Sequence, residues 1–191
     1  KFSSNGECIW AHNAGGEGGC GDYSTIGLDK DNNVLISGIA GTIMDFGNGF
    51  KFTHKSSGIY VAKYSNDGQL IWAKSPEGSG EAQGLGIDKE GNVFIGGYFV
   101  SEVAFDNIKL NSQPDNKGDA YVAKYGPDGK AIWAKRFGGE DGEIASCETD
   151  GLGNIYLGGL YFSKKISTEV STLTNNGLIN AFMAKYNRDG N

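Results

Sequence analysis

The chain has 191 residues with a net charge of −6, and it contains 32 Gly but only 3 Pro. Its Lys and Arg residues are dispersed, which disfavours nucleic acid or an anionic membrane surface as a partner, and no apolar run approaches the roughly 20 residues that span a bilayer. So much Gly without a Gly-X-Y period, among many aromatic and β-branched residues, excludes collagen and disorder and indicates many tight turns.

A phrase that contains a tryptophan recurs along the chain with a spacing of roughly 61 residues. In each copy a Lys and an aromatic residue precede a polar turn that ends in Gly, and Ile-Trp-Ala follows. The three complete copies occupy 1–11, 63–73 and 124–134. A fixed period of this length predicts a repeat architecture.

The period predicts a single domain of three repeats, approximately 1–62, 63–123 and 124–184, plus the start of a fourth at 185–191. Because the first and last residues both fall inside a repeat, we expect the chain to be cut from a longer protein. No signal peptide is visible, and a targeting segment would lie outside this sequence.

Each repeat is expected to contain two β-hairpins. In the central copy, aromatic and β-branched residues predict a strand at 59–64, and a turn ending in Asp-Gly leads to a second strand at 69–74. Strands at 85–88 and 93–98 predict the second hairpin. The other copies repeat this pattern at 26–29, 34–38, 120–125, 147–150, 154–159 and 181–186. No stretch has the apolar period of a long helix.

A variable stretch of about twenty residues completes each repeat, within the loops 42–58, 100–118 and 162–180. Such a stretch could form a short outer hairpin or a long loop, and both readings stay open.

Four antiparallel strands per repeat predict an all-β chain, a β-propeller fragment of three blades of about four strands each. A sheet with two apolar faces cannot bury both alone, so it stacks against copies of itself. The small residues of the Gly-Ile-Asp strand suit the crowded centre, and the Trp strand suits the wide outer part. A solenoid or an open sandwich is the alternative, although solenoid repeats are normally shorter.

Closed propellers usually have four to eight blades, so three blades need an explanation. The first explanation is that the chain is truncated, and the alternative is that several chains assemble into one ring. Made alone, this chain would expose an apolar sheet face at each end, and we therefore expect self-association.

The repeated phrases resemble the bacterial β-propeller repeat family called SBBP repeats. In the third copy the family pattern is matched, in order, by Asp119–Tyr125, Asp128-Gly129, Trp133, Gly138-Gly139, Asp150 and 153–158. The first copy departs most, with Asn32-Asn33 in place of Gly-Asn and 57–59 in place of Asp-Ala. The resemblance implies a secreted or cell-surface bacterial protein, hence an extracellular or surface location, and it implies no shared catalytic residues.

The cysteines give no firm redox compartment. Cys8 and Cys147 stand in columns of small apolar strand residues and are expected to pack as such. Cys20 lies in a Gly-rich loop, and a Cys8–Cys20 disulfide is an open alternative.

Asp29, Asp31 and Asn33 have the alternating oxygen-bearing residues that begin a calcium loop. The other copies lack this spacing, and Asp, Gly and Asn also suit a tight hairpin. We therefore interpret the segment as a turn, with calcium binding as the alternative.

Other motifs are interpreted structurally. Gly16–Gly21 matches Gly-x-Gly-x-x-Gly, but a dinucleotide site needs a following helix, which is not predicted. His12 and His54 have no evident Ser or Cys partner with a third orienting group, so no catalytic triad is indicated. The repeated lysines Lys63, Lys124 and Lys185 are expected to be exposed or ion-paired strand residues. The three tryptophans are expected to be core residues between blades.

The sequence therefore favours a non-enzymatic binding or scaffold module that recognises a protein or a glycan through its blade loops. No catalytic residue, metal ligand or cofactor is assigned. The alternative is an enzyme at the mouth of the propeller channel, either a quinone-dependent dehydrogenase or a polysaccharide-cleaving enzyme with paired carboxylates. Asp45, Glu102 and Asp106 lie in loops and are the acidic candidates for it.

Overall fold

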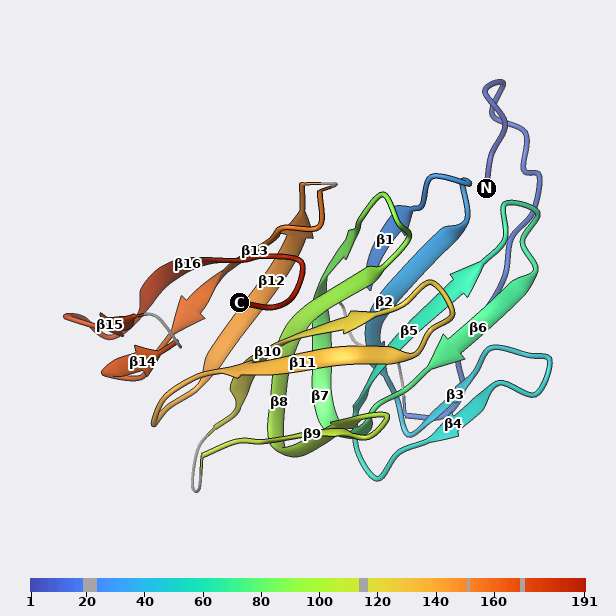
Figure 1. Ribbon diagram of the computed structural model, residues 1–191. Helices are drawn as coiled ribbons and strands as arrows, with labels where there is room; N and C mark the ends of the chain where they lie inside the picture. Colours follow the sequence, from blue (N-terminus) through green and yellow to red (C-terminus); the bar gives the residue numbers. More distant parts are fainter. Residues whose placement is uncertain (19–23, 114–116, 151, 169–170) are drawn as a thin grey trace.

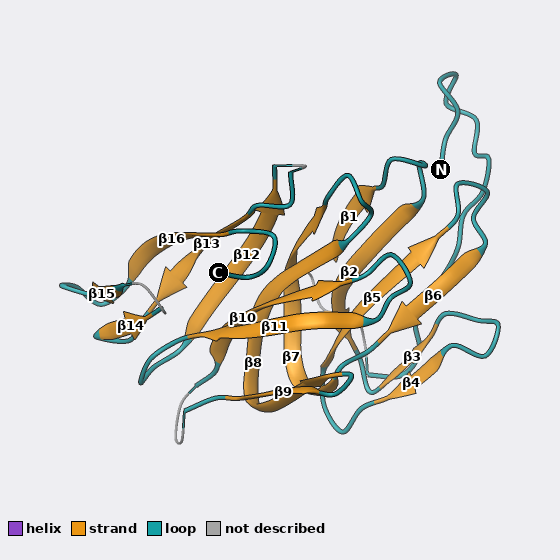
Figure 2. Ribbon diagram, in the orientation of Figure 1, coloured by secondary structure: helices purple, strands orange, loops and turns teal. Residues whose placement is uncertain are grey.

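The computed structural model describes residues 1–18, 24–113, 117–150, 152–168 and 171–191 (Figure 1). In this part of the chain there are sixteen β-strands and no helix (Figure 2). The strands are β1 Ser24–Leu28, β2 Val34–Ala40, β3 Ile43–Asp45, β4 Lys51–Thr53, β5 Gly58–Tyr64, β6 Leu70–Lys74, β7 Glu77–Ile87, β8 Val93–Phe105, β9 Ile108–Asn111, β10 Asp119–Tyr125, β11 Ala131–Phe137, β12 Glu143–Thr149, β13 Ile155–Tyr161, β14 Lys165–Ser167, β15 Thr172–Thr174 and β16 Asn180–Tyr186.

Three antiparallel sheets account for most of these strands, and they confirm the predicted all-β class. The first sheet has the order β1-β2-β5-β6, and the second has the matching order β7-β8-β10-β11, with β9 added beside β8. The third sheet has the order β12-β13-β16. The strand expected to carry small residues (β1, β7 or β12) is therefore at one edge of each sheet. The strand that carries the tryptophan (β6 or β11) is at the opposite edge of the first two sheets.

The variable stretches form short outer hairpins, which settles the alternative left open by the sequence. β3 pairs with β4 and β14 pairs with β15, while in the central copy the long strand β8 continues outward and pairs with β9. No described helix is long and apolar enough to cross a bilayer.

The sheets follow one another in chain order, face against face (Figure 1). One apolar cluster joins the first and second sheets, and a second cluster joins the second and third. The first seam includes Leu35, Val61 and Trp72 against Leu85, Ile95 and Tyr121. The second includes Phe94, Val122 and Phe137 against Cys147, Leu157 and Phe182.

The edge strands β1, β7 and β12 approach closely across the two seams, in agreement with the expected role of their small residues. A Cβ built on Gly27 would lie 2.8 Å from Cδ1 of Ile87, and one on Gly86 would lie 2.6 Å from Cγ2 of Thr149. Real side-chain carbons do not approach so closely, so glycine sets the spacing of the sheets at this edge.

Each tryptophan contacts the hairpin turn of the next unit. Trp72 donates from Nε1 to the carbonyl of Pro127 at 3.0 Å, and its ring covers Gly129. Trp10 makes the same 3.0 Å bond to Asn66 and covers Gly68. The ring of Trp133 covers Gly190 in turn. The repeated Trp phrase is thus a link between consecutive sheets.

Candidate functional site

A cleft of about 500 Å³ lies between the second and third sheets. Its walls come from β7, β8 and β12 and from the loops that precede β10, precede β12 and follow β13. The lining residues are Glu81, Gln83, Tyr98, Lys117, Asp141, Gly142, Glu143, Ile144 and Phe162. Concave sites with an apolar wall and a few fixed polar groups are the usual form of a ligand-binding pocket.

The second-sheet wall of the cleft carries a hydrogen-bonded trio. The Tyr98 hydroxyl donates to Oε1 of Glu81 at 3.0 Å, and the Gln83 amide donates to the other oxygen at 3.2 Å. Burial, followed by the Glu81 carboxylate, raises the pKa of Tyr98 to about 12. The phenol therefore stays protonated at neutral pH, and both partners hold the Glu81 carboxylate in one orientation.

Glu143, on the third-sheet wall, is only 1% exposed. Ser163 donates its hydroxyl to Oε1 of Glu143, and the backbone N–H of Gly139 donates to Oε2 at 3.1 Å. Burial raises the pKa of Glu143 to about 7, and the nearby carboxylate of Asp119 adds to this rise. This carboxyl therefore exchanges its proton near neutral pH.

Asp119 is fully buried beside Glu143, and its charge is balanced by Arg136. The guanidinium Nη1 lies 2.7 Å from Oδ2 of Asp119, and the backbone N–H of Gln113 donates to the same oxygen at 3.2 Å. The guanidinium thus lies directly against the Asp119 carboxyl group, and Glu143 is the member of this carboxyl pair whose pKa is raised.

The rim of the cleft is more exposed. Lys117 and Asp141 form an ion pair at 3.5 Å; the Lys117 side chain is largely open to solvent, and that of Asp141 is about half exposed. Phe162 is 40% exposed, and its backbone N–H donates to the carbonyl of Gly142 at 3.1 Å. The rim thus adds one aromatic surface and one charged pair to the polar walls.

The cleft was not predicted from the sequence. The signal was present, because Glu81 and Glu143 stand four residues before Leu85 and Cys147, which are equivalent positions in the repeat. Asp22 holds that position in the first copy and lies outside the described residues. An acidic residue in every copy at the start of the Gly-Ile-Asp strand could have marked the site.

The Asp29 segment forms a hairpin turn with every carboxylate oxygen engaged. Oδ1 of Asp29 accepts the backbone N–H groups of Asp31 and Asn33, each at 2.9 Å. Oδ2 accepts the Asn33 side-chain amide and lies 2.9 Å from the Lys63 ammonium. Asp88 with Asn92 and Asp150 with Asn154 make the same turn in the other two sheets.

Two of the repeated lysines are buried, contrary to a simple exposed role. Lys63 is in the ion pair with Asp29, and Lys124 donates to the carbonyl of Arg188 across the second seam at 2.9 Å. Lys185 is exposed and lies 5.1 Å from the centre of the Tyr156 ring. These contacts give the first two lysines structural roles.

His54 contacts a serine that the sequence did not point to. Ser75 Oγ lies 2.7 Å from Nε2 of His54 and 2.6 Å from the carbonyl of Ile59. A carbonyl can only accept, so the Ser75 hydroxyl donates to Ile59 and the imidazole N–H donates to Ser75. This is the reverse of the polarity that activates a nucleophilic serine. His12, the other histidine, is exposed, and its ring stacks on that of Tyr64 with 5.7 Å between the ring centres.

The three acidic candidates are not brought into one site, and two of them lie in strands and not in loops, Asp45 in β3 and Glu102 in β8. Asp45 accepts the backbone N–H of Gly47 at 2.8 Å, in the outer hairpin of the first sheet. Glu102 is 3.2 Å from Lys109, and Asp106 accepts the backbone N–H of Ala131 at 2.8 Å. Each carboxylate is engaged in a local contact.

Two further sequence motifs fall partly beyond the described residues. Cys20, and with it the Cys8–Cys20 pairing, lies in the undescribed stretch 19–23, as does the end of the Gly16–Gly21 motif. The first segment described after it is the strand β1, and a dinucleotide motif would need a helix there. Cys147 is buried as expected, whereas Cys8 is exposed, outside any of the three sheets.

A second concave region of about 950 Å³ lies over the outer face of the first sheet. It is bounded by apolar side chains of β1 and β2 and by the N-terminal segment with Trp10. Ile26 and Leu28 are 74% and 59% exposed there, although both are large and apolar. Its composition suits contact with another sheet better than a small polar ligand.

No known family model matches the sequence. The chain is similar to an uncharacterized WD repeat-containing protein of Acanthamoeba polyphaga mimivirus, with 29% identity over 167 aligned positions. The alignment covers 70% of this chain and 12% of the length of that relative. Face-packed antiparallel sheets of repeated order and similarity to a WD repeat-containing protein together identify the fold as a series of β-propeller blades.

Proposed function

We propose that the protein is a non-enzymatic binding or scaffold module built of propeller blades, which recognises a protein or a glycan through the cleft between its second and third sheets. The resemblance to SBBP repeats supports a secreted or cell-surface location in a bacterium. The relative is described as a WD repeat-containing protein, and a propeller that offers one surface to a partner is consistent with that description.

The proposal rests on a difference between two sets of polar residues: those that recur in every copy hold the fold together, whereas most of those that line the cleft differ among the copies. The repeated Asp, Asn and Trp side chains are engaged in turns and seams. The cleft, by contrast, gathers Gln83, Tyr98 and Phe162, from positions where the copies differ, around Glu81, which stands at a position that is acidic in every copy. Carboxylate acceptors, an amide and aromatic rings are suited to hydroxyl-rich or peptide ligands.

The experiment is a glycan array and an immobilised-peptide array probed with the wild-type chain and with Phe162→Ala. Phe162 is partly exposed at the rim, so its truncation should leave the fold intact and reduce binding at least tenfold. Ile132→Ala, at an exposed position of β11 away from the cleft, is the matched control. Binding that Phe162→Ala does not change would contradict the cleft as the recognition site.

A polysaccharide-cleaving enzyme is the second candidate, and one observation favours it. Glu143 has a pKa of about 7 in a cleft that also holds Glu81, and a general acid paired with a second carboxylate is what glycoside cleavage requires. Against it, Glu143 is almost fully buried. Release of reducing sugar by the wild-type chain and its loss in Glu143→Gln would replace the binding proposal with this one.

A further inference from the structure

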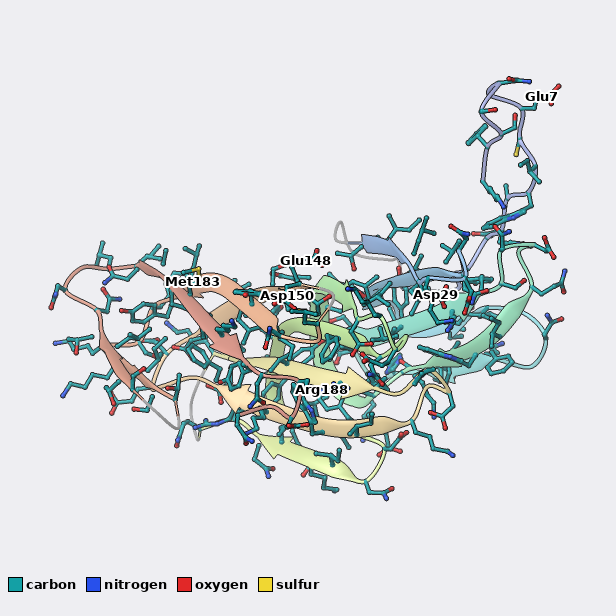
Figure 3. All side chains as sticks on the ribbon, turned by 45° about the horizontal axis from the view of Figure 1, so that its top comes forward. Glu7, Asp29, Glu148, Asp150, Met183 and Arg188 are labelled. Atoms are coloured by element: carbon teal, nitrogen blue, oxygen red, sulfur yellow. The ribbon has the colours of Figure 1, made fainter. Side chains whose placement is uncertain are left out.

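The outer face of the third sheet is apolar and open. Met183 is 80% exposed, whereas the equivalent residues Val61 and Val122 are 0% and 1% exposed. Tyr156 is 37% exposed, and its counterparts Leu35 and Phe94 are fully buried. The residues that fill the two internal seams are thus repeated on this face with nothing in the described chain to cover them (Figure 3).

The outer face of the first sheet is also apolar and open, and it corresponds to the opposite side of an internal seam. Ile26 is 74% exposed, whereas the equivalent Leu85 and Cys147 are 8% and 4% exposed because the preceding sheet covers them. The two outer faces of the described sheets are therefore the two halves of a seam that the sheets already form twice internally. One half is on the third sheet, and the other half is on the first.

The third sheet also has an unused strand edge. β5 pairs with β6, and β10 pairs with β11, but β16 pairs only with β13 among the described strands. The segment equivalent to β6 and β11 is 8–13, where Cys8 takes the column of Leu70 and Ala131. This segment joins none of the three sheets, and it lies at the opposite end of the molecule from β16 (Figures 1 and 3).

We propose that two copies of this chain join head to tail at both ends. In each joint, the third sheet of one copy packs on the first sheet of the other, and residues 8–13 of the second copy add to β16 as its fourth strand. The occupant is a second copy because the matching face and the matching strand both belong to this chain. Two copies would make six consecutive sheets, within the four to eight of closed propellers.

The internal hairpins set the register of the added strand. Lys63 pairs with Trp72, and Tyr64 pairs with Leu70. The second hairpin repeats this register, with Lys124 opposite Trp133 and Tyr125 opposite Ala131. The joint therefore places Lys185 opposite Trp10 and Tyr186 opposite Cys8.

In such a joint, residues 1–6 of one copy and residues 185–190 of the other would compete for the same place. Lys1–Gly6 repeats the phrase at 185–190, and Lys1 now donates to the carbonyl of Asn66 at 3.1 Å. In the joint, Lys185 of the neighbouring copy takes over that carbonyl, as Lys124 does for Arg188 within the chain. Lys1–Gly6 is displaced.

The association is tested by sedimentation velocity over a range of concentrations. The wild-type chain should have twice the mass of one chain, and Met183→Asp and Ile26→Asp should each weaken the pairing by about 30-fold or more. Both positions are exposed in the single chain, so the charge should not unfold it. Ile132→Asp, on an exposed face outside the joint, should pair like the wild type.

Three results would overturn the pairing: a wild-type chain of single mass at every concentration, pairing that neither Asp variant weakens, or masses that grow beyond two chains. The register has its own test. Under mild oxidation, Tyr186→Cys should form an intermolecular disulfide with Cys8, whereas Asn180→Cys, at the other end of β16, should not. Equal Cys8 cross-linking in both variants would refute the added strand.

Discussion

At the residue scale, the glycine that ends the repeated polar turn meets two requirements in three of its copies, at Gly68, Gly129 and Gly190. Gly129 has a φ of 78°, in the left-handed region, and a Cβ there would lie 2.8 Å from Cδ2 of Trp72. The first requirement belongs to the turn, and the second belongs to the seam between two sheets. A single residue therefore couples hairpin geometry to the packing of blades.

The two requirements can be separated with a matched pair of substitutions. Gly47 has the same φ of 78°, but a Cβ there would meet nothing within 4 Å. Gly47→Ala should lower the free energy of unfolding by about 1–2 kcal/mol for the backbone alone, and Gly129→Ala by about 1–3 kcal/mol more for the displaced ring. Urea unfolding measures both, and equal losses would show that the Trp72 contact contributes nothing.

Glu143 makes stability depend on pH. Its pKa is raised in the folded state from the ordinary 4.5 to about 7, so between these values the folded state holds more proton than the unfolded chain. The contribution of Glu143 to the free energy of unfolding is therefore largest below pH 4.5, and it is lost as the pH rises to about 7. Glu143→Gln, which cannot ionise, should remove this fall.

The measurement is the free energy of unfolding at pH 5 and pH 8 for both proteins. The wild type should lose on the order of 2 kcal/mol more than Glu143→Gln across this interval. Parallel pH profiles would mean that the carboxyl of Glu143 ionises freely in the folded protein.

At the element scale, the hairpins follow directly from the sequence, because alternating apolar residues and Asp-Gly or Asn-containing turns are local signals. The outer hairpins could not be decided, since the variable stretches differ among copies. The contact of His54 with Ser75 could not be foreseen either, because the two residues are 21 positions apart and meet only when β5 and the end of β6 are paired.

The cleft was missed for a related reason. Its walls belong to two different repeats, and nothing in a single repeat shows which side chains face each other across a seam. Glu81 and Glu143 occupy equivalent columns but acquire different partners, Tyr98 in one case and Ser163 in the other. Strand pattern predicts the sheets, whereas the site depends on how the sheets are stacked.

The Asp29 hairpin gives an element-scale prediction about calcium. Its carboxylate oxygens are engaged by three N–H donors and the Lys63 ammonium, so a divalent ion would have to displace them. Millimolar Ca²⁺ or a chelator should therefore leave Tm unchanged within about 1 °C. A clear rise of Tm with Ca²⁺ that Asp31→Asn abolishes would restore the calcium interpretation.

At the scale of the whole molecule, one seam design is used repeatedly. Apolar faces, close glycines and a Trp-to-turn hydrogen bond join the first sheet to the second, and apolar faces and glycines join the second to the third. The middle sheet is covered on both faces, and each end sheet has one open face. Local stability should therefore be graded along the chain instead of uniform.

Hydrogen exchange of the single chain tests this stacking most directly. In Met183→Asp, which keeps the chains apart, amides of β8 and β10 in the middle sheet should exchange at least about tenfold more slowly than those of β1 and β16 at the two ends. Equal exchange in all three sheets, or slower exchange in the end sheets, would contradict face-to-face packing of consecutive blades.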